Sequence, residues 1–441
     1  MTADHDPIRA SDGAIQRLRA LHPPLIDLST GRIERLLQAL GRPQDRMGRV
    51  IHVAGTNGKG STCAFLRAIG EAAGLTVNVL TSPHLVRFSE RIRIHGQLIS
   101  DGALSDRIDE VEAANAGQPI SFFEIATALA FHAFARAGGD LAVIEVGLGG
   151  RFDATNVFAA PAVSVITPVD LDHVEMLGSD IARIAWEKAG ILKAGRPAVI
   201  GRQRDEAFDV IEHEAEAVGA PLTAMGRDFD AFAEAGRLRV QMADRLLDLP
   251  APSLSGGHQF DNAALAAVAA LSLSDRRIDD AAVAEGVARA TWPGRFQRLT
   301  AGPLATRARN RGADLWLDGA HNPHAARALA RSCSDLAARD GRPVHLIVGM
   351  LERKDAAGFF AAFTELSPGV VVAGFSSPAA ASAASLLAAA RAAGLEAEVA
   401  DSAEAALRLI LARDRVGHVV ICGSLHFIGD VLAADPATWP C

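Results

Sequence analysis

Short apolar runs rich in β-branched residues alternate along the first half of the chain with longer stretches rich in alanine and leucine. The short runs predict buried strands, among them Val50–Ala54, Leu141–Val146 and Val163–Thr167. The longer stretches predict helices, such as Gly58–Ala73 and Phe122–Arg136. Because strands that alternate with helices form a parallel sheet covered by helices, this half is expected to be an α/β domain.

The pattern changes after the middle of the chain and then resumes. Residues Pro221–Pro252 form short mixed segments, which predict a small antiparallel excursion. Residues 292–295 read W-P-G-R, a turn-forming sequence that places a domain boundary there. Beyond it, apolar runs such as Val344–Val348 alternate again with helical stretches. We therefore expect a larger α/β domain of residues 1–294, built on a parallel sheet, and a smaller Rossmann-like α/β domain of residues 295–441.

The composition narrows the class of protein. Hydrophobic residues make up 49% of the chain and charged residues 22%, as in globular, water-soluble proteins. The net charge of −8 argues against a nucleic-acid partner, which would require clustered positive charge. No apolar run reaches the ~20 residues that span a bilayer, and the polar N-terminus does not resemble a signal peptide. The four cysteines are scattered, which predicts neither a zinc site nor disulfides and indicates a reducing, cytoplasmic location.

A glycine-rich segment, V-A-G-T-N-G-K-G-S, ends at Ser61 between a predicted strand and a predicted helix. It resembles the phosphate-binding loop G-x-x-x-x-G-K-[ST], but the stretch between Gly55 and Gly58 is shorter, and Gly60 follows Lys59. Backbone N–H groups of such a loop bind phosphate, the lysine neutralises it, and the hydroxyl reaches magnesium. The alternative is an ordinary turn with a surface lysine. Strand, glycines, lysine, hydroxyl and helix together favour the phosphate loop.

The shortened form G-T-N-G-K-G-[ST] resembles the Mur ligase superfamily and, within it, the bacterial bifunctional folylpolyglutamate synthase/dihydrofolate synthase family. The resemblance extends from I-D-L at residues 26–28 to G-S-L-H at residues 423–426. One motif would be weak evidence, but an ordered set is specific. The further signatures are S-P-H-L from Ser82, S-F-F-E from Ser121, E-V-G-L-G-G-R-F-D-A-T-N from Glu145, D-H from Asp172, E-K-A-G from Glu187, P-G-R-F-Q from Pro293 and D-G-A-H-N-P from Asp318.

The resemblance implies a magnesium site. Glu145 ends an apolar strand before a glycine-rich loop, where open α/β sheets bind ligands, although a solvated acid would also fit there. The family pattern makes Glu145, Ser61 and Ser82 magnesium ligands. Magnesium prefers oxygen, so chemistry alone favours a surface or capping role for His173. The resemblance instead implies that His173 helps to bind a second metal.

Lys188 lies near the end of a predicted helix, where a lysine commonly interacts with the helix dipole. The resemblance implies a different role, in which carbon dioxide carbamylates this lysine and the carbamate orients a metal. Carbamylation requires a neutral amine, which partial burial favours. With Lys59 of the phosphate loop and His173 at the second metal, the resemblance implies three catalytic residues: Lys59, Lys188 and His173.

The resemblance also implies which residues contact each substrate. Asn262 would contact the nucleotide, although asparagine is also a common helix cap. Phe122 and Phe123 would stack on the acid substrate, although adjacent phenylalanines are as often core residues. Residues expected at the nucleotide are Gly58, Lys59, Gly60, Ser61, Asn262, Arg295 and Asp318. Residues expected at the acid substrate or glutamate are Phe122, Phe123, Arg151, Asp153, Thr155, His321 and Ser424.

The implied protein is a cytoplasmic, monomeric ligase that uses Mg²⁺ and ATP. It would join L-glutamate to dihydropteroate, tetrahydrofolate or both through an acyl phosphate, releasing ADP and phosphate, with closure of the two domains on the substrates. One alternative is a Mur-type ligase for another carboxylate, although the segment before Gly55 is too short for a UDP-binding domain. The other is a P-loop NTPase binding module. Neither nucleic acid nor membrane is expected as a partner.

Overall fold

The computed structural model describes residues 7–22 and 29–440, so the I-D-L signature at residues 26–28 and Cys441 lie outside the described residues. The chain divides into two compact units. The first contains Met1–Ser253 and Phe260–Ala290, and the second contains Leu254–Gln259 and Thr291–Pro440. The assignment of residues 1–294 and 295–441 to separate functional domains stays a prediction. None of the described helices is long and apolar enough to cross a membrane.

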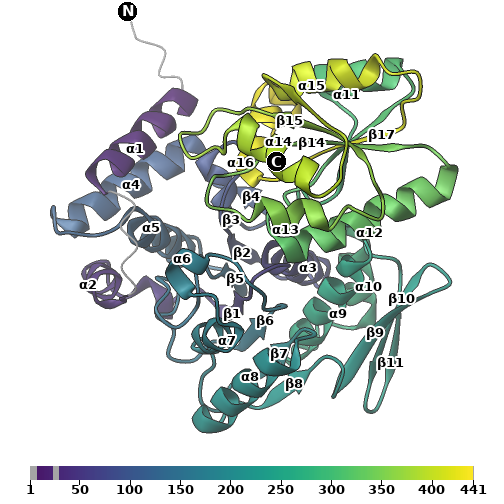
Figure 1. Cartoon of the computed structure of the whole chain (residues 1–441). Helices are drawn as coiled ribbons and strands as arrows, with labels where there is room; N and C mark the ends of the chain where they lie inside the picture. The colour runs from purple at the N-terminus through teal and green to yellow at the C-terminus, as the bar shows by residue number, and fades with distance from the viewer. Residues whose placement is uncertain (1–6, 23–28, 441) are drawn as a thin grey trace, which may run out of the picture. The chain divides into compact units, whose positions relative to one another are not determined.

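The first unit is built on an eight-stranded sheet with the order β4-β3-β2-β5-β1-β6-β7-β8. β1 (Arg49–Ala54) lies between β5 (Leu141–Glu145) and β6 (Val163–Ile166) and is parallel to both (Figure 1). The expected parallel sheet is thereby confirmed, and only its β3–β4 edge is antiparallel. The remaining strands are β2 (Val77–Leu80), β3 (Ile92–Ile94), β4 (Gln97–Leu98), β7 (Ala198–Ile200) and β8 (Leu222–Ala224).

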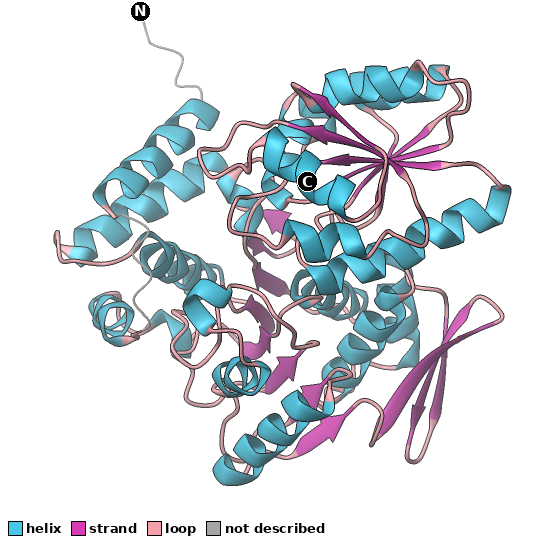
Figure 2. Ribbon diagram, in the orientation of Figure 1, coloured by secondary structure: helices cyan, strands magenta, loops and turns pink. Residues whose placement is uncertain are grey.

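Helices lie on both sides of this sheet (Figure 2). The central strands are therefore buried on both faces, which explains their predominantly apolar sequence. One core cluster joins α1, α2, α4 and α5 to the sheet, and another joins α7 and α8 to β6 and β7. The helices are α1 (Pro7–Leu21), α2 (Gly31–Ala39), α3 (Lys59–Ala72), α4 (Asp101–Asn115), α5 (Phe122–Ala137), α6 (Val174–Leu177), α7 (Ile181–Ala189), α8 (Asp205–Val218), α9 (His258–Leu271) and α10 (Asp280–Arg289).

A separate three-stranded antiparallel sheet follows β8 and confirms the predicted excursion. It consists of β9 (Phe229–Glu234), β10 (Arg237–Met242) and β11 (Leu246–Leu249). Its strands alternate between buried and exposed positions, as expected when one face of a sheet packs against the protein and the other faces water.

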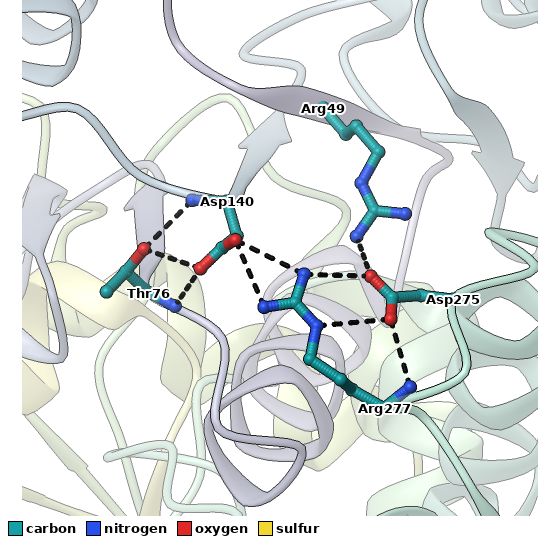
Figure 3. A network of polar contacts seen from close by, with 5 residues as sticks. All are labelled: Arg49, Thr76, Asp140, Asp275 and Arg277. Carbon is teal, nitrogen blue, oxygen red and sulfur yellow. Dashed lines mark hydrogen bonds and ion pairs between the residues drawn. The ribbon is translucent and has the colours of Figure 1, made fainter.

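An ionic network ties together the edge at which the strands of the first unit begin (Figure 3). Arg277 contacts Asp275 and Asp140, with its Nη2 atom 3.0 Å and 3.2 Å from the respective carboxylate oxygens. Asp140 precedes β5 and also accepts a hydrogen bond from Thr76 Oγ1 at 2.8 Å, just before β2. Arg49 at the start of β1 pairs with Asp275. The network therefore fixes the loop after α9 to the edge of the sheet where β1, β2 and β5 begin. The opposite edge, where these strands end, takes no part in this network.

The second unit has a six-stranded sheet with the order β12-β13-β17-β14-β15-β16. All neighbouring strands are parallel except β12 and β13, which confirms the predicted second α/β domain. The last strand of the chain, β17 (His418–Cys422), lies between β13 (Asp314–Leu317) and β14 (Val344–Val348). The other elements are β12 (Gln297–Leu299), β15 (Gly369–Ala373), β16 (Ala397–Ala400), α11 (Gly302–Asn310), α12 (Pro323–Asp340), α13 (Ala356–Ala361), α14 (Ala383–Ala392), α15 (Ala403–Leu411) and α16 (Leu425–Ala433).

Candidate active site

The glycine-rich segment connects the end of β1 to the start of α3, as the sequence predicted. Gly55 has a φ of +140°, and a Cβ atom there would overlap Thr167. Gly58 has a φ of +91°, and a Cβ atom there would lie 2.5 Å from Asn262 Oδ1. Both positions therefore require glycine. The strand, tight loop and helix N-terminus form the geometry that binds phosphate groups, with Asn262 of α9 directly beside it.

Two lysines converge on one carbonyl of this loop. Lys59 Nζ donates to Gly55 O at 3.1 Å, and Lys188 Nζ donates to the same oxygen at 2.8 Å. Lys188 lies at the end of α7 but is only 4% exposed, so it is not a solvated helix-terminal cation. Burial, and to a lesser extent the charge of Lys59, lowers the pKa of Lys188 to about 7. Much of this amine is therefore neutral near physiological pH.

A carboxylate and a serine meet at the edge where the strands end. Glu145 is the last residue of β5, pairs with Val53 of β1 and is only 4% exposed. Its Oε2 atom accepts a hydrogen bond from the backbone N–H of Ser82 at 3.0 Å. Ser61, in the first turn of α3, is also buried. These positions offer the hard oxygen atoms that magnesium prefers.

The donor set fits magnesium better than a transition metal. Among the described residues, no three histidine, cysteine, aspartate or glutamate side chains are grouped so that they could hold a metal ion. Magnesium does not need such a group, because it commonly uses one or two protein carboxylates and completes its shell with water and substrate phosphates. Glu145 and hydroxyl groups beside a phosphate loop are compatible with that mode.

His173 belongs to a segment that is attached to the phosphate loop. Thr56 Oγ1 donates to Asp170 O at 2.9 Å and accepts from the N–H of Asp170 at 3.1 Å. His173 follows in a left-handed conformation with a φ of +52° at the start of α6, and its N–H donates to Asp172 Oδ1 at 2.9 Å. The fold therefore brings this segment to the loop across 114 positions of sequence.

The loop after Glu145 is held by a series of hydrogen bonds between buried side chains. Asp153 accepts hydrogen bonds from the N–H of Leu148 at 2.8 Å and from Thr155 Oγ1 at 2.6 Å. Thr155 Oγ1 also lies 2.8 Å from His52 Nε2. Burial lowers the pKa of His52 to about 3, so its ring is neutral and Nε2–H donates to Thr155. Asp153 and Thr155 thus shape this loop, and their contact with a substrate stays a prediction.

No sequence motif marks His52 as part of the site. It lies within β1, and Thr155 is 103 residues away in the chain. The available signal was a polar residue inside an otherwise apolar strand. Such a residue requires a buried hydrogen-bonding partner.

Arg151 and the neighbouring glycines join the same loop to α7. The guanidinium of Arg151 forms an ion pair with Glu214 and lies over the ring of Trp186, 3.9 Å from its centre. These contacts occupy Arg151, and its role in substrate binding stays a prediction. A Cβ atom at Gly150 would lie 2.7 Å from Glu187 O, so the loop packs directly on the helix that carries Lys188. Glu187 was not among the predicted site residues, and burial raises the pKa of its carboxyl.

The two adjacent phenylalanines begin α5 and are half-buried. Phe122 lies edge to face with Phe88, with ring centres 6.0 Å apart, and the guanidinium of Arg19 lies over its ring, 5.4 Å from the centre. Phe123 packs against Gly147, where any larger residue would overlap its ring. The rings therefore belong partly to the core and partly to the surface beside the loop that follows Glu145.

In the second unit, Asp318, His321 and Ser424 lie at the edge where β13 and β17 end. Asp318 is buried and accepts hydrogen bonds from the N–H groups of Phe296 and Ala320, both at 2.8 Å. His321 Nδ1 bonds to Gly319 O at 2.9 Å, and Ser424 caps α16. The Gly423 N–H donates to Ala320 O at 3.0 Å, so the two loops are joined.

Arg295 is half-buried in the same unit and follows the predicted boundary. Its Nη1 atom donates to Gly294 O at 3.2 Å. A Cβ atom at Gly319 would lie 2.6 Å from that same nitrogen. The guanidinium of Arg295 is thus held against the loop that follows Asp318. Burial raises the pKa of the Asp318 carboxyl.

Comparisons with known proteins agree with these features. Residues 53–270 match the Mur ligase middle domain, and residues 294–425 match the Mur ligase glutamate ligase domain. A dihydrofolate synthase/folylpolyglutamate synthase of Escherichia coli is 36% identical over 94% of this chain and 93% of its own length. A Bacillus subtilis protein of the same name is 39% identical over 68% of this chain and 71% of its own.

Solved structures extend the agreement to the fold. Escherichia coli FolC in complex with DHPP and ADP has a TM-score of 0.85 and 33% identity, covering 96% of this chain and 97% of its own. A Yersinia pestis bifunctional folylpolyglutamate synthase/dihydrofolate synthase with AMPPNP and Mn ion also has a TM-score of 0.85, with 34% identity and the same coverage. The resemblance seen in the motifs is confirmed: the chain belongs to the Mur ligase family, in its dihydrofolate synthase/folylpolyglutamate synthase group.

Proposed function

We propose that the protein is an ATP-dependent ligase that joins L-glutamate to a folate-type carboxylic acid, which is dihydropteroate, tetrahydrofolate or both. One observation carries this proposal. The phosphate loop follows β1, and the buried carboxylate of Glu145 ends the neighbouring strand β5. The buried amine of Lys188 contacts the loop carbonyl of Gly55. This arrangement suits a reaction in which several anionic groups must be held together.

ATP is assigned to the phosphate loop, where backbone N–H groups and the N-terminus of α3 face the phosphates. Lys59 neutralises the outer phosphates once its ammonium group leaves the carbonyl of Gly55. Asn262 is placed beside Gly58 for contact with the nucleotide. The complete assignment to the nucleotide is Gly58, Lys59, Gly60, Ser61, Asn262, Arg295 and Asp318.

Ser61, Ser82, Glu145 and His173 would hold magnesium, which when bound neutralises phosphate charge and lowers the repulsion between two anions. The neutral amine of Lys188 attacks carbon dioxide, forms a carbon–nitrogen bond and releases a proton, which leaves a carbamate anion. The low pKa of Lys188 supports this modification, because only the unprotonated amine reacts. Carbamylation would convert a buried cation into an anion suited to orienting a metal.

The reaction then proceeds in two transfers. A carboxylate oxygen of the acid substrate attacks the γ-phosphorus of ATP, and the bond to the leaving ADP breaks. The amine of glutamate attacks the acyl phosphate, loses a proton and expels phosphate to form the amide. The residues assigned to the acid substrate are Phe122, Phe123, Arg151, Asp153 and Thr155, and those assigned to glutamate are His321 and Ser424.

The test uses the purified full chain with ATP, magnesium and glutamate, and offers dihydropteroate and tetrahydrofolate in separate reactions. We expect mass spectrometry to detect an acceptor that is one glutamyl residue heavier, together with an equal amount of phosphate. Phosphate release that needs neither acceptor nor glutamate would instead indicate an NTPase module. Glutamate addition to some other carboxylate would indicate a different Mur-type ligase. Gel filtration and fractionation of cells test the expected monomer and cytoplasmic location.

Lys59→Ala tests the role of the phosphate loop directly. We expect amide synthesis to fall at least a hundredfold, because the charge beside the outer phosphates is lost. Arg289→Ala removes a cation on the exposed side of α10 and serves as the control, with activity expected to remain near that of the parent protein. Full activity of the Lys59→Ala protein would refute the assignment.

A further inference from the structure

Four arginines line a hollow of about 490 Å³ in the second unit. They are Arg311, Arg342, Arg413 and Arg415, and among the described residues of this lining only Asp414 is acidic. The arginines lie on three loops, which lead into β13, β14 and β17. Those strands are neighbours in the sheet, so the three loops meet at the edge where the strands begin.

Two of these arginines are already paired with carboxylates outside the lining. Arg342 forms ion pairs with Asp314 and Asp340, and its distance to Asp340 is 2.9 Å. Arg413 pairs with Glu398 at 2.8 Å. These pairs fix the two guanidinium groups in place. A ligand that binds them therefore restricts little further side-chain motion, which lowers the entropic cost of binding.

The other two arginines, Arg311 and Arg415, are not held by carboxylates in this way. Arg311 donates two hydrogen bonds to the neutral carbonyl of Leu411, at 3.1 Å and 2.8 Å. In the part of the chain that the structure describes, neither Arg311 nor Arg415 forms an ion pair, and both are exposed. Four guanidinium groups and one carboxylate therefore line the hollow, and two of the guanidinium groups are free of ion pairs with described residues, in a chain whose net charge is −8.

We propose that this hollow binds a small ligand that carries several phosphate or carboxylate groups. Guanidinium forks bind both groups through paired hydrogen bonds, which gives directional as well as electrostatic selectivity. Most binding sites for flat organic ligands are lined by apolar and aromatic side chains. The described lining has no aromatic residue, which argues against a nucleobase or a pterin as the recognised part.

The hollow is separate from the residues assigned to catalysis in this unit. Asp318 and Ser424 follow the ends of β13 and β17, whereas the hollow lies where these strands begin. The five residues of β17 separate the two edges by about 16 Å at the usual rise per residue. A ligand in the hollow therefore does not occupy the proposed glutamate site, and the inference does not depend on the proposed ligase reaction.

Titration calorimetry tests the proposal with two probes, inorganic tripolyphosphate and a linear γ-linked tetraglutamate, which distinguish a phosphate source from a carboxylate source. The full chain carries Lys59→Ala, so that binding at the phosphate loop is weakened. Arg311→Gln with Arg415→Gln removes the two guanidinium groups that form no ion pair with a described residue. Arg276→Gln with Arg289→Gln is the matched control, because both arginines are exposed in the first unit and their loss changes the net charge equally.

We expect one probe or both to bind with a stoichiometry of one, and the pocket variant to bind at least tenfold more weakly than the control variant. A response to only one probe identifies the anionic group that is recognised. Equal affinities in the two double variants, or no binding of either probe, would overturn the proposal. A thermal denaturation curve unchanged between the variants shows that lost binding does not reflect lost folding.

Discussion

The two hydrogen bonds that join His52, Thr155 and Asp153 offer a sharp test of how the fold positions the loop after Glu145. Thr155 is fully buried, and its hydroxyl group both donates to Asp153 and accepts from His52. Thr155→Val replaces that hydroxyl by a methyl group of similar size and removes both bonds. Asp153 keeps its bonds from the backbone N–H groups of Leu148 and residue 155, so the loop is weakened rather than released.

The size of the effect follows from the two lost bonds. A hydrogen bond to a charged group contributes about 1.5–3 kcal/mol, and a buried N–H left without a partner costs about 1–3 kcal/mol. Thr155→Val should therefore destabilise the first unit by about 3–5 kcal/mol. Thr155→Ser retains the hydroxyl and loses only one methyl group, which should cost about 1 kcal/mol.

Calorimetric unfolding and steady-state kinetics provide the measurements. We expect Thr155→Val, but not Thr155→Ser, to lower the unfolding temperature of the first unit markedly. It should raise KM for the acid substrate more than KM for ATP, because the displaced loop is not the phosphate loop. In a His52→Leu background the same valine substitution should cost less, since no N–H is then left unpaired. Equal stability of the valine and serine variants would refute the proposed chain of hydrogen bonds.

Two further substitutions, one of them with a matched control, test the packing and the charges of the first unit. Gly150→Ala should reduce ligase activity at least tenfold, because its methyl group would meet Glu187 O at 2.7 Å, whereas Gly102→Ala meets open space and should be neutral in the same assay. Asp275→Asn should lower the free energy of unfolding at pH 7 by about 1–3 kcal/mol, as measured by urea denaturation. The bond from Arg277 depresses the pKa of Asp275 in the folded state. That stabilisation is complete above the unfolded pKa of about 3.9 and is lost as pH falls toward the folded value, so mutant and parent should converge in stability at acidic pH.

The arrangement of the sheets could be predicted where the sequence signal is local. Predominantly apolar runs identified β1 and β5, because strands covered on both faces carry few polar residues. β16 escaped prediction, since its sequence A-E-V-A is short and its central residues are exposed. β12 was missed for a similar reason, as an antiparallel edge strand with two polar residues. Edge strands lack the burial that makes the inner strands recognisable.

The candidate site shows the same division. The glycines of the phosphate loop and the carboxylate of Glu145 follow directly from strand ends, so their positions could be inferred from neighbouring residues. The position of Lys188 could be stated, but its burial against Gly55 O depends on a contact across 133 residues. His52 likewise acquires its role only when Thr155 reaches it. Long-range contacts of this kind have no periodic or local signature.

The polar groups buried at the ends of the first unit's strands explain why this edge carries the chemistry. Lys188, Glu145, Asp153 and Glu187 are all nearly inaccessible to water, and burying a charged group is unfavourable even when it is paired. At the opposite edge, the charges of the network around Arg277 remain partly exposed and need little desolvation. Burial lowers the pKa of Lys188 and raises those of Asp153 and Glu187. Buried groups with shifted pKa values are those that can exchange protons and hold ions near neutral pH, so this edge, and not the opposite one, is suited to the chemistry.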